Sequence, residues 1–344
     1  MSQLMELIDL AHKQASQELV FHPDSTPRIR KGRDLVPLVQ PAQNVRWSLA
    51  QQRQLLFSFL SEEEKDKLIE TKFLSGSRKL DEQKINFHLF MDKNGLQGEV
   101  FWNTPGVANN SVWGFSDFYT EPVWKKGGFT VVIGANRSGR TCVMQSLIYP
   151  GMQKRNSHVA VITNEDHWEL QSGHSLISYF DVEVLKDKNF SLPNSVDVVV
   201  IDTNEAAADL PIRQWSNEGR SILFSMSQQN LRKSLEQLAR TYQSDIFEYF
   251  NMAIFVKRIP CQDGTHIGTY ELLMGHPAIR EYLVQGRYSE VQKNIDLSQD
   301  KKSHRSLNQN LLQLVLKRKI DLKIAFEESA QPEELDQLLK KIGI

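Results

Sequence analysis

The sequence has few cysteines: Cys142 and Cys261 are the two that it contains among 344 residues. Two cysteines provide neither a disulfide framework nor a zinc-binding quartet, so we expect a reducing, cytoplasmic environment and no structural metal. Long apolar runs are also missing, since a stretch such as Val196–Ile201 is far too short to cross a bilayer. The N-terminus lacks the basic start and apolar core of a signal peptide.

A charge excess of either sign is absent as well. Lys and Arg number 41 and Asp and Glu number 42, which gives a formal net charge of −1. Nucleic-acid-binding domains are usually basic, so this balance argues against nucleic acid as the main partner. Hydrophobic residues make up 40% and charged residues 24% of the chain, as in ordinary globular proteins. The length is sufficient for two domains with separate cores.

The first part of the chain, residues 1–103, has the pattern of a small α+β domain. Ser48 and Ser61 each precede a helical stretch and are favourable N-cap residues. Asn94-Gly95 separates two apolar stretches and is a typical hairpin turn. We therefore expect helices that begin at the two serines and an antiparallel hairpin that turns at Asn94-Gly95.

Residues 104–115 are rich in turn-forming residues and predict a linker. In residues 116–344, strands alternate with helical stretches, which implies a parallel sheet flanked by helices, an α/β fold. The expected elements are strands at Phe129–Ile133, Val159–Ile162, Val196–Ile201 and Ile222–Ser225, a helix near Ala206–Trp215, an antiparallel pair at Met252–Arg258 and Gly268–Met274, and helices from Pro277 onward.

The most informative stretch is residues 127–141, Gly-Gly-Phe-Thr-Val-Val-Ile-Gly-Ala-Asn-Arg-Ser-Gly-Arg-Thr. A buried strand, a glycine-bounded loop and the first turn of a helix follow one another, as in the phosphate-binding loop G-x-x-x-x-G-K-[ST]. Arg140 replaces the lysine of this pattern, and a planar, forked guanidinium is not equivalent to a compact ammonium group. The alternative is a glycine-bounded loop without a ligand. The residues predicted to form a degenerate nucleotide-binding loop are Gly134, Asn136, Arg137, Ser138, Gly139, Arg140 and Thr141.

Carboxylates follow two of the expected strands. Asp202 ends an apolar strand and resembles the aspartate that holds Mg²⁺ beside a phosphate-binding loop; the alternative is a capping Asp on a buried strand. Glu165 and Asp166 follow another strand, where carboxylates point toward a nucleotide site. Their alternative is a solvated acidic loop. Glu165 and Glu205 are the only candidates for catalytic residues, and neither has the position of an assured base.

Six aromatic residues lie near the expected linker. We interpret them as an interdomain packing surface rather than a platform that stacks bases. They are Trp102, Trp113, Phe115, Phe118, Tyr119 and Trp124.

The segment from Tyr270 to Val291 contains Gly-His-Pro-Ala-Ile-Arg, ending at Arg280. This segment resembles the E-I-[ML]-x-G-x-P-A-I-R-N-L-I-R-E-G-K motif of type IV pilus retraction ATPases, PilT-like members of the secretion-ATPase superfamily. The opening Gln14–Phe21 and the stretch Pro27–Arg30 are similar to two further motifs of that family. The likeness covers essentially the whole chain.

The resemblance implies a PAS-like N-terminal domain, a RecA-like P-loop domain with a helical C-terminal tail, and a hexameric ring. It also implies ATP and Mg²⁺ as cofactors and an inner-membrane pilus platform protein as partner, with the ring in the cytoplasm and peripheral to the membrane. In that family the ring uses ATP hydrolysis to extract pilin in twitching motility.

The departures from the family pattern fall on catalytic groups. Three family arginines align with Asn86, Asn94 and Trp102, and the glutamate after the Mg²⁺-binding strand aligns with Thr203. A family histidine is missing from the segment Ser225–Gln228. Because arginines that contact phosphate are worth orders of magnitude in rate, these losses predict impaired catalysis.

We therefore expect a degenerate paralogue of these ATPases, a structural or regulatory subunit that is inactive or a very weak ATPase. Two alternatives remain open, a functioning retraction ATPase and a sensor that binds nucleotide without hydrolysis. Arg280 is predicted to lie at an interface, either in a homo-hexamer or with an active sister ATPase; its alternative role is an intradomain salt bridge.

Overall fold

A computed structural model describes most of the chain. The described residues are 3–14, 16–23, 25–31, 34–38, 48–80, 83–102, 113, 115, 117–164, 168, 170, 173–187, 190–203, 210–262, 265–297 and 304–343. The chain divides into two compact units, Met1–Pro105 with Pro260–His266, and Gly106–Ile259 with Ile267–Ile344. Most of the predicted linker, residues 104–115, lies outside the described residues, apart from Trp113 and Phe115.

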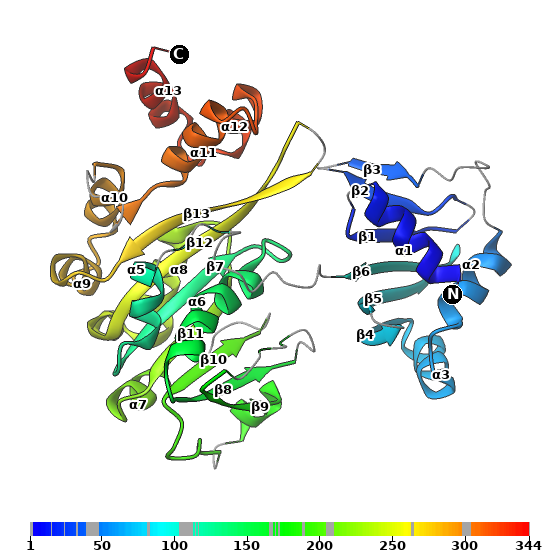
Figure 1. Cartoon of the computed structure of the whole chain (residues 1–344), viewed down its shortest axis with the longest axis horizontal. Coiled ribbons are helices and arrows are strands. Elements are labelled where there is room, and N and C mark those ends of the chain that lie inside the picture. The colour runs from blue at the N-terminus through cyan, green and yellow to red at the C-terminus, as the bar shows by residue number, and fades with distance from the viewer. Residues whose placement is uncertain are drawn as a thin grey trace. The chain divides into compact units, whose positions relative to one another are not determined.

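The first unit is a six-stranded antiparallel sheet in the order β3-β2-β1-β6-β5-β4, accompanied in its described residues by helices α1, α2 and α3 (Figure 1). Its elements are α1 (Gln3–Lys13), β1 (Glu18–Phe21), β2 (Arg28–Lys31), β3 (Asp34–Pro37), α2 (Leu49–Phe57), α3 (Glu62–Thr71), β4 (Phe73–Leu80), β5 (Gln83–Asp92) and β6 (Gly95–Trp102).

Local sequence signals set these elements, as expected. The Ser48 and Ser61 hydroxyls accept hydrogen bonds from the third backbone N–H of α2 and α3, completing a capping box at each helix start. Gly95 turns the β5–β6 hairpin with a φ of 130°, a conformation that favours glycine. The predicted helix starts and hairpin are confirmed.

Trp102 is a core residue of the first unit. It is 1% exposed, belongs to the apolar cluster of this unit and lies with its ring 5.2 Å from the His12 ring. Phe115, Tyr119 and Trp124 belong instead to a buried cluster of the second unit. The prediction that the aromatic residues form one interdomain surface is therefore wrong, because most of them fill two separate cores. Phe118 differs from these, with 43% of its surface exposed.

The second unit contains an eight-stranded sheet in the order β14-β13-β12-β7-β11-β10-β8-β9. Its elements are α5 (Asp117–Thr120), η1 (Glu121–Trp124), β7 (Gly128–Gly134), α6 (Arg140–Lys154), β8 (His158–Thr163), β9 (Leu176–Phe180), η2 (Val182–Lys186), β10 (Val198–Asp202), α7 (Ile212–Asn217), β11 (Ser221–Ser227), α8 (Leu231–Tyr242), η3 (Ser244–Tyr249), β12 (Phe250–Pro260), β13 (His266–Met274), α9 (Pro277–Val284), α10 (Tyr288–Leu297), β14 (His304–Arg305), α11 (Leu307–Leu316), α12 (Leu322–Glu328) and α13 (Pro332–Lys341).

The sheet of the second unit is mostly parallel. β12 pairs parallel with β7, β7 with β11, β11 with β10, β10 with β8 and β8 with β9, while β13 and β14 are antiparallel. The predicted α/β class with a parallel sheet is confirmed. Part of the helix predicted near 206–215 lies outside the described residues, and the described helix α7 covers Ile212–Asn217.

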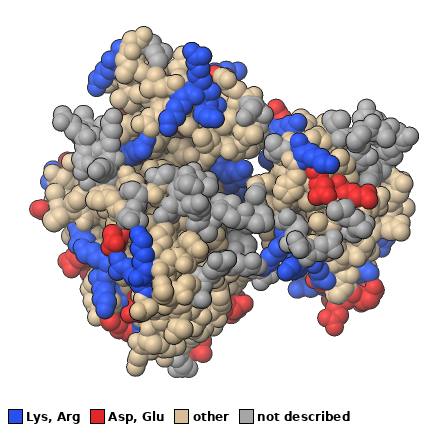
Figure 2. All heavy atoms as spheres, viewed as in Figure 1, with Lys and Arg blue, Asp and Glu red and all other residues tan. Residues whose placement is uncertain are grey.

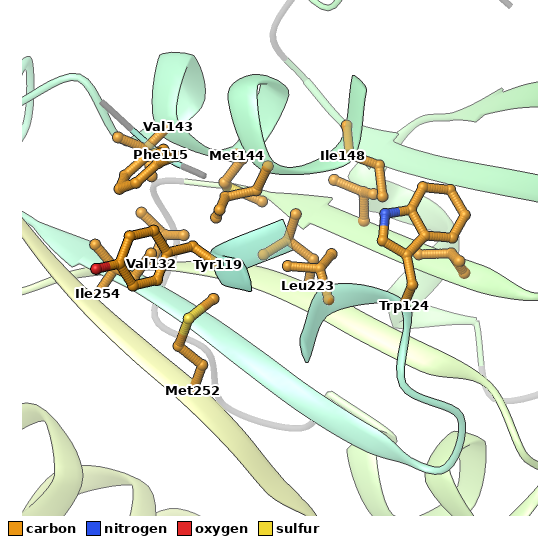
Figure 3. Packing of buried hydrophobic residues seen from close by; sticks show 14 of the residues in the cluster. Phe115, Tyr119, Trp124, Val132, Val143, Met144, Ile148, Leu223, Met252 and Ile254 are labelled. Atoms are coloured by element: carbon orange, nitrogen blue, oxygen red, sulfur yellow. The ribbon is translucent and has the colours of Figure 1, made fainter. Parts of the chain in front are cut away.

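The core of the second unit lies between α6 and the sheet. Figure 3 shows Val143, Met144 and Ile148 of α6 facing Val132 of β7 and Leu223 of β11, and each of these side chains is fully buried. The apolar face of α6 therefore fixes the helix over the strands that precede and follow it. This packing determines where the helix N-terminus lies relative to the carboxyl ends of the parallel strands.

The surface of each unit mixes charges of both signs. On the face in Figure 2, Lys and Arg side chains lie among Asp and Glu side chains over both units. Among the described residues, no helix is both long and apolar enough to traverse a bilayer.

Candidate phosphate-binding site

The loop between β7 and α6 is built around two residues with positive φ. Gly139 has a φ of 97° and Arg137 a φ of 64°. Ser138 donates its backbone N–H to the Ala135 carbonyl at 3.1 Å, which closes the turn between them. A non-glycine residue in the left-handed region costs about 1–2 kcal/mol, so the chain keeps this loop conformation at Arg137 despite the side chain.

Gly134 has no room for a side chain. A Cβ there would lie 2.3 Å from Ser138 Oγ and 2.7 Å from the Val256 carbonyl oxygen. The Ser138 hydroxyl is buried and has no hydrogen-bond partner among the described residues. The glycine thus lets the loop fold back closely over the end of β7, and it leaves one buried hydroxyl available to a ligand.

The N-terminus of α6 has no side-chain cap. Gly139 is its N-cap residue and provides no side-chain hydrogen bond to the helix. A helix N-terminus carries partial positive charge and free N–H donors, which together favour an anion. Strand β7, the glycine-bounded loop and this 15-residue helix together form the elements of a phosphate-binding loop.

Thr141 and Asp202 are in direct contact at this edge of the sheet. The Thr141 hydroxyl donates to Asp202 Oδ2 at 2.6 Å, across the intervening strand β11. Asp202 is 4% exposed. A hydroxyl and a carboxylate in contact beside a phosphate-binding loop are the residue types that hold Mg²⁺ with nucleotide phosphates, so these two residues fit that cation.

Trp168 is a member of this site that the sequence patterns did not reveal. Its indole Nε1 donates to the same Asp202 Oδ2 at 2.9 Å, and its side chain is 4% exposed. Asp202 therefore receives a hydroxyl and an indole donor rather than a guanidinium. In the described part of the chain, no hydrogen bond or ion pair joins Asp202 to Arg137 or Arg140.

Arg140 is the first residue of α6, and its side chain contacts the loop that precedes the helix. It is 7% exposed, and its Nη2 donates to Asn136 Oδ1 at 3.3 Å. Asn136 Oδ1 also accepts from the Ser227 hydroxyl at 3.0 Å, which ties the loop to the end of β11. The side chain at the lysine position thus engages a loop amide.

The ends of β10 and β11 carry neutral groups at the positions where the related family has catalytic side chains. Ser225 Oγ accepts from the Thr203 N–H at 3.2 Å and donates to the Thr203 carbonyl at 3.1 Å. Gln228 donates to Gln237 Oε1 of α8 at 2.5 Å. These side chains join the strands and helix α8 to one another. The candidates Glu165 and Glu205, together with Asp166, lie outside the described residues.

Cys142 follows Thr141 at the start of α6. Burial raises the pKa of the Cys142 thiol; the Arg258 charge opposes this shift and the Asp202 charge adds to it. The pKa of this thiol therefore depends on the charges of Asp202 and Arg258 as well as on burial.

Arg280 lies far from this loop along the strands. Its Nε donates to the Phe250 carbonyl at 2.7 Å and its Nη2 to Asn251 Oδ1 at 3.1 Å, both at the start of β12. Because β12 is parallel to β7, its start lies at the opposite edge of the sheet from the loop. These contacts are hydrogen bonds to neutral groups within the second unit, and no described carboxylate forms an ion pair with Arg280. Its interface role stays a prediction.

The sequence matches no family model and no curated protein. Among solved structures, the fold is similar to that of the pilus retraction motor PilT with bound ADP, with a TM-score of 0.74 and 17% identity over 97% of this chain and 99% of that chain. It is similar to the ATPase DotB of Legionella pneumophila, with a TM-score of 0.74 and 13% identity over 94% of this chain and 95% of that chain.

The ATPase DotB of Yersinia pseudotuberculosis also has a TM-score of 0.74 to this chain, with 14% identity over 95% of this chain and 93% of that chain. The chain therefore shares the fold of PilT and DotB over nearly its full length. At these identities the likeness establishes the fold, which the resemblance in sequence predicted.

Proposed function

We propose that this chain is a subunit of a pilus or secretion motor whose phosphate-binding loop is retained and whose hydrolysis is impaired. It acts as a structural or regulatory member of a ring, either of identical subunits or with an active sister ATPase. The ring works in the cytoplasm against an inner-membrane platform protein. The likeness of its fold to PilT and DotB along almost the whole chain supports this assignment.

The position of Arg140 is the observation that carries the proposal. Phosphoryl transfer is accelerated mainly by positive groups that are placed on the charge developing in the transition state. The Arg140 guanidinium is 7% exposed and contacts Asn136 within the loop, so it does not present a compact ammonium group to the β- and γ-phosphates. Each missing contact of this kind costs about 10²–10³-fold in rate.

The ends of the neighbouring strands support the same proposal. Thr203 follows Asp202 where the related pattern has glutamate, and it offers no carboxylate to orient a water molecule. Gln228 lies where that pattern has histidine, and its amide is bound to Gln237. A site without these groups holds phosphate more readily than it cleaves it.

A nucleotide sensor is the second candidate function, and the contact between Thr141 and Asp202 favours it. The two groups that would hold Mg²⁺ meet at 2.6 Å, and neither is bound to an arginine. The helix N-terminus and the Ser138 hydroxyl add donors for phosphate. ATP and Mg²⁺ would then act as a bound signal that changes the contacts of the ring.

Two measurements on the purified protein separate these functions. Steady-state ATPase assays of wild type and Arg140→Ala should both give background rates. Turnover of about 1 s⁻¹, within the ordinary enzyme range, that disappears in Arg140→Ala would falsify the proposal. Calorimetry with MgATP then decides between the candidates: affinity in the millimolar range or weaker supports the structural subunit, and micromolar affinity without turnover supports the sensor.

A further inference from the structure

A pocket of about 430 Å³ lies in the second unit, away from the phosphate-binding loop. It is formed by α5, η1, the start of β12, the end of β13 and the start of α9. Among the residues that line it are Phe118, Trp124, Lys125, Asn251, His276 and Arg280. Because β12 begins beside the beginning of β7, the pocket lies at the amino-terminal edge of the parallel strands. The phosphate-binding loop lies at their carboxyl edge, so the two sites are distinct.

Two glycines lie against the groups that hold Arg280 in this pocket. A Cβ at Gly275 would lie 2.2 Å from the Phe250 carbonyl oxygen, and that carbonyl accepts from Arg280 Nε at 2.7 Å. A Cβ at Gly128 would lie 2.4 Å from Asn251 Nδ2. The two glycines therefore leave room for the groups that hold the guanidinium in one orientation.

Asn251 is itself held between two partners. Its Nδ2 donates to the Pro122 carbonyl at 3.3 Å, and its Oδ1 accepts from Arg280 Nη2 at 3.1 Å. The amide therefore has a fixed orientation, with its oxygen toward the arginine. Arg280 Nη1 is left without a protein acceptor among the described residues, and Arg280 lines the pocket.

The positive charge of Arg280 is not compensated by a carboxylate in the described part of the chain. Both of its acceptors are neutral, and burial alone lowers the pKa of the guanidinium. A partly buried charge without a counter-charge is costly unless something pairs with it. Glu121, the one acid that lines the pocket, is bound to Arg155 at 2.9 Å, and Lys125 forms no ion pair with a described residue.

Aromatic side chains line the same pocket as these cations. The Phe118 side chain is 43% exposed, and Trp124 forms part of the same pocket. An exposed phenylalanine beside an uncompensated arginine suits a ligand that carries a carboxylate next to an apolar side chain. A free inorganic anion would use the cations and leave the aromatic wall in water.

We infer that this pocket binds an acidic segment of a partner protein, with a carboxylate on Arg280 and Lys125 and a neighbouring apolar side chain on Phe118. The geometry of the guanidinium favours the carboxylate, since its free N–H groups are planar and match two carboxylate oxygens. The volume of about 430 Å³ accommodates a small number of side chains rather than a whole domain. The site requires no nucleotide.

The test uses a fragment with this chemistry and a neutral copy of it. Indole-3-acetate carries a carboxylate on an aromatic body, and indole-3-acetamide has the same shape without charge. We expect ligand-observed NMR on the full chain to show roughly tenfold tighter binding of the acetate than of the acetamide. The preference should disappear in Arg280→Gln and fall severalfold in Lys125→Gln. Lys125 is exposed, so its variant keeps the test valid if Arg280→Gln does not fold.

Two further variants serve as controls for the binding measurement. Phe118→Ala should weaken both fragments and keep the preference for the charged one. Arg140→Ala, in the phosphate-binding loop, should change neither. Equal binding of the two fragments by wild type, or a full preference in Lys125→Gln and in folded Arg280→Gln, overturns the inference. So does displacement of the acetate by inorganic phosphate at similar concentration, because that result describes a simple anion site.

Discussion

Trp168 and Asp202 meet at the carboxyl ends of two parallel strands, with the indole Nε1 2.9 Å from Asp202 Oδ2. The same oxygen accepts from Thr141 at 2.6 Å, so one carboxylate oxygen is fixed by donors from two separate segments. A carboxylate with donors on one oxygen has a defined rotamer. Trp168 therefore positions the group that would face a cation and is expected to be important for stability as well.

Replacing Trp168 with phenylalanine tests this hydrogen bond. Loss of a donor to a charged, buried acceptor should lower the free energy of unfolding by about 1–3 kcal/mol, measured in urea. Trp124→Phe is the matched control, because the Trp124 indole N–H has no partner among the described residues and the variant loses no hydrogen bond. Equal losses in the two variants would show that the indole donor contributes nothing.

The backbone at Arg137 predicts a second pair of variants. Its φ of 64° is compatible with glycine and unfavourable for a β-branched residue. We expect Arg137→Gly to keep wild-type stability within about 1 kcal/mol and Arg137→Val to lose about 1–2 kcal/mol more than that. Both variants remove the same charge, so thermal or urea unfolding isolates the backbone effect. Equal stability of the two variants would mean that the loop relaxes out of the left-handed conformation.

Gly134 predicts a clash that a second substitution relieves in part. Gly134→Ala places a methyl group against Ser138 Oγ and the Val256 carbonyl, and overpacking of this kind costs about 1–3 kcal/mol in unfolding free energy. In Gly134→Ala with Ser138→Ala, the hydroxyl contact is removed and the carbonyl contact remains. The double variant should therefore lie between Gly134→Ala and wild type in a urea titration. A double variant no more stable than Gly134→Ala would assign the whole clash to the carbonyl.

Cys142 predicts a pH-dependent reaction at the loop. Because burial raises the pKa of its thiol, the reactive thiolate is scarce near neutral pH and becomes more abundant as the pH rises. In a Cys261→Ser background, iodoacetamide should modify Cys142 more slowly than a free thiol near neutral pH and faster with increasing pH. Arg258→Gln should slow the reaction further, since the Arg258 charge favours the thiolate. A faster reaction in that variant would contradict the electrostatic assignment.

Local patterns predicted the parts of the fold that local chemistry determines. The glycines at 134 and 139 with the apolar run before them were enough to place a strand, a loop and a helix, because spacing along the chain sets that geometry. Ser48 and Ser61 predicted helix starts for the same reason. The edge strand β9 was missed, because it is five residues long and Ser178 interrupts its apolar residues.

The site was less predictable, since its contacts are non-local. Trp168 reaches Asp202 across a separation that no sequence spacing encodes. Trp102 aligned with a family arginine and was interpreted as surface, whereas the tertiary packing buries it in the first core. The Arg280 contacts with Phe250 and Asn251 also depend on chain segments that meet only in the folded protein.

Strand β7 has at each end a glycine whose position has no room for a side chain. A side-chain carbon at Gly128 would collide with Asn251, and one at Gly134 would collide with Ser138, while every residue between them is buried. A one-residue insertion in this strand would push Phe129 into the first of these positions or Ile133 into the second. The strand therefore cannot accommodate an added residue by sliding, and this limits the span between the loop and the pocket.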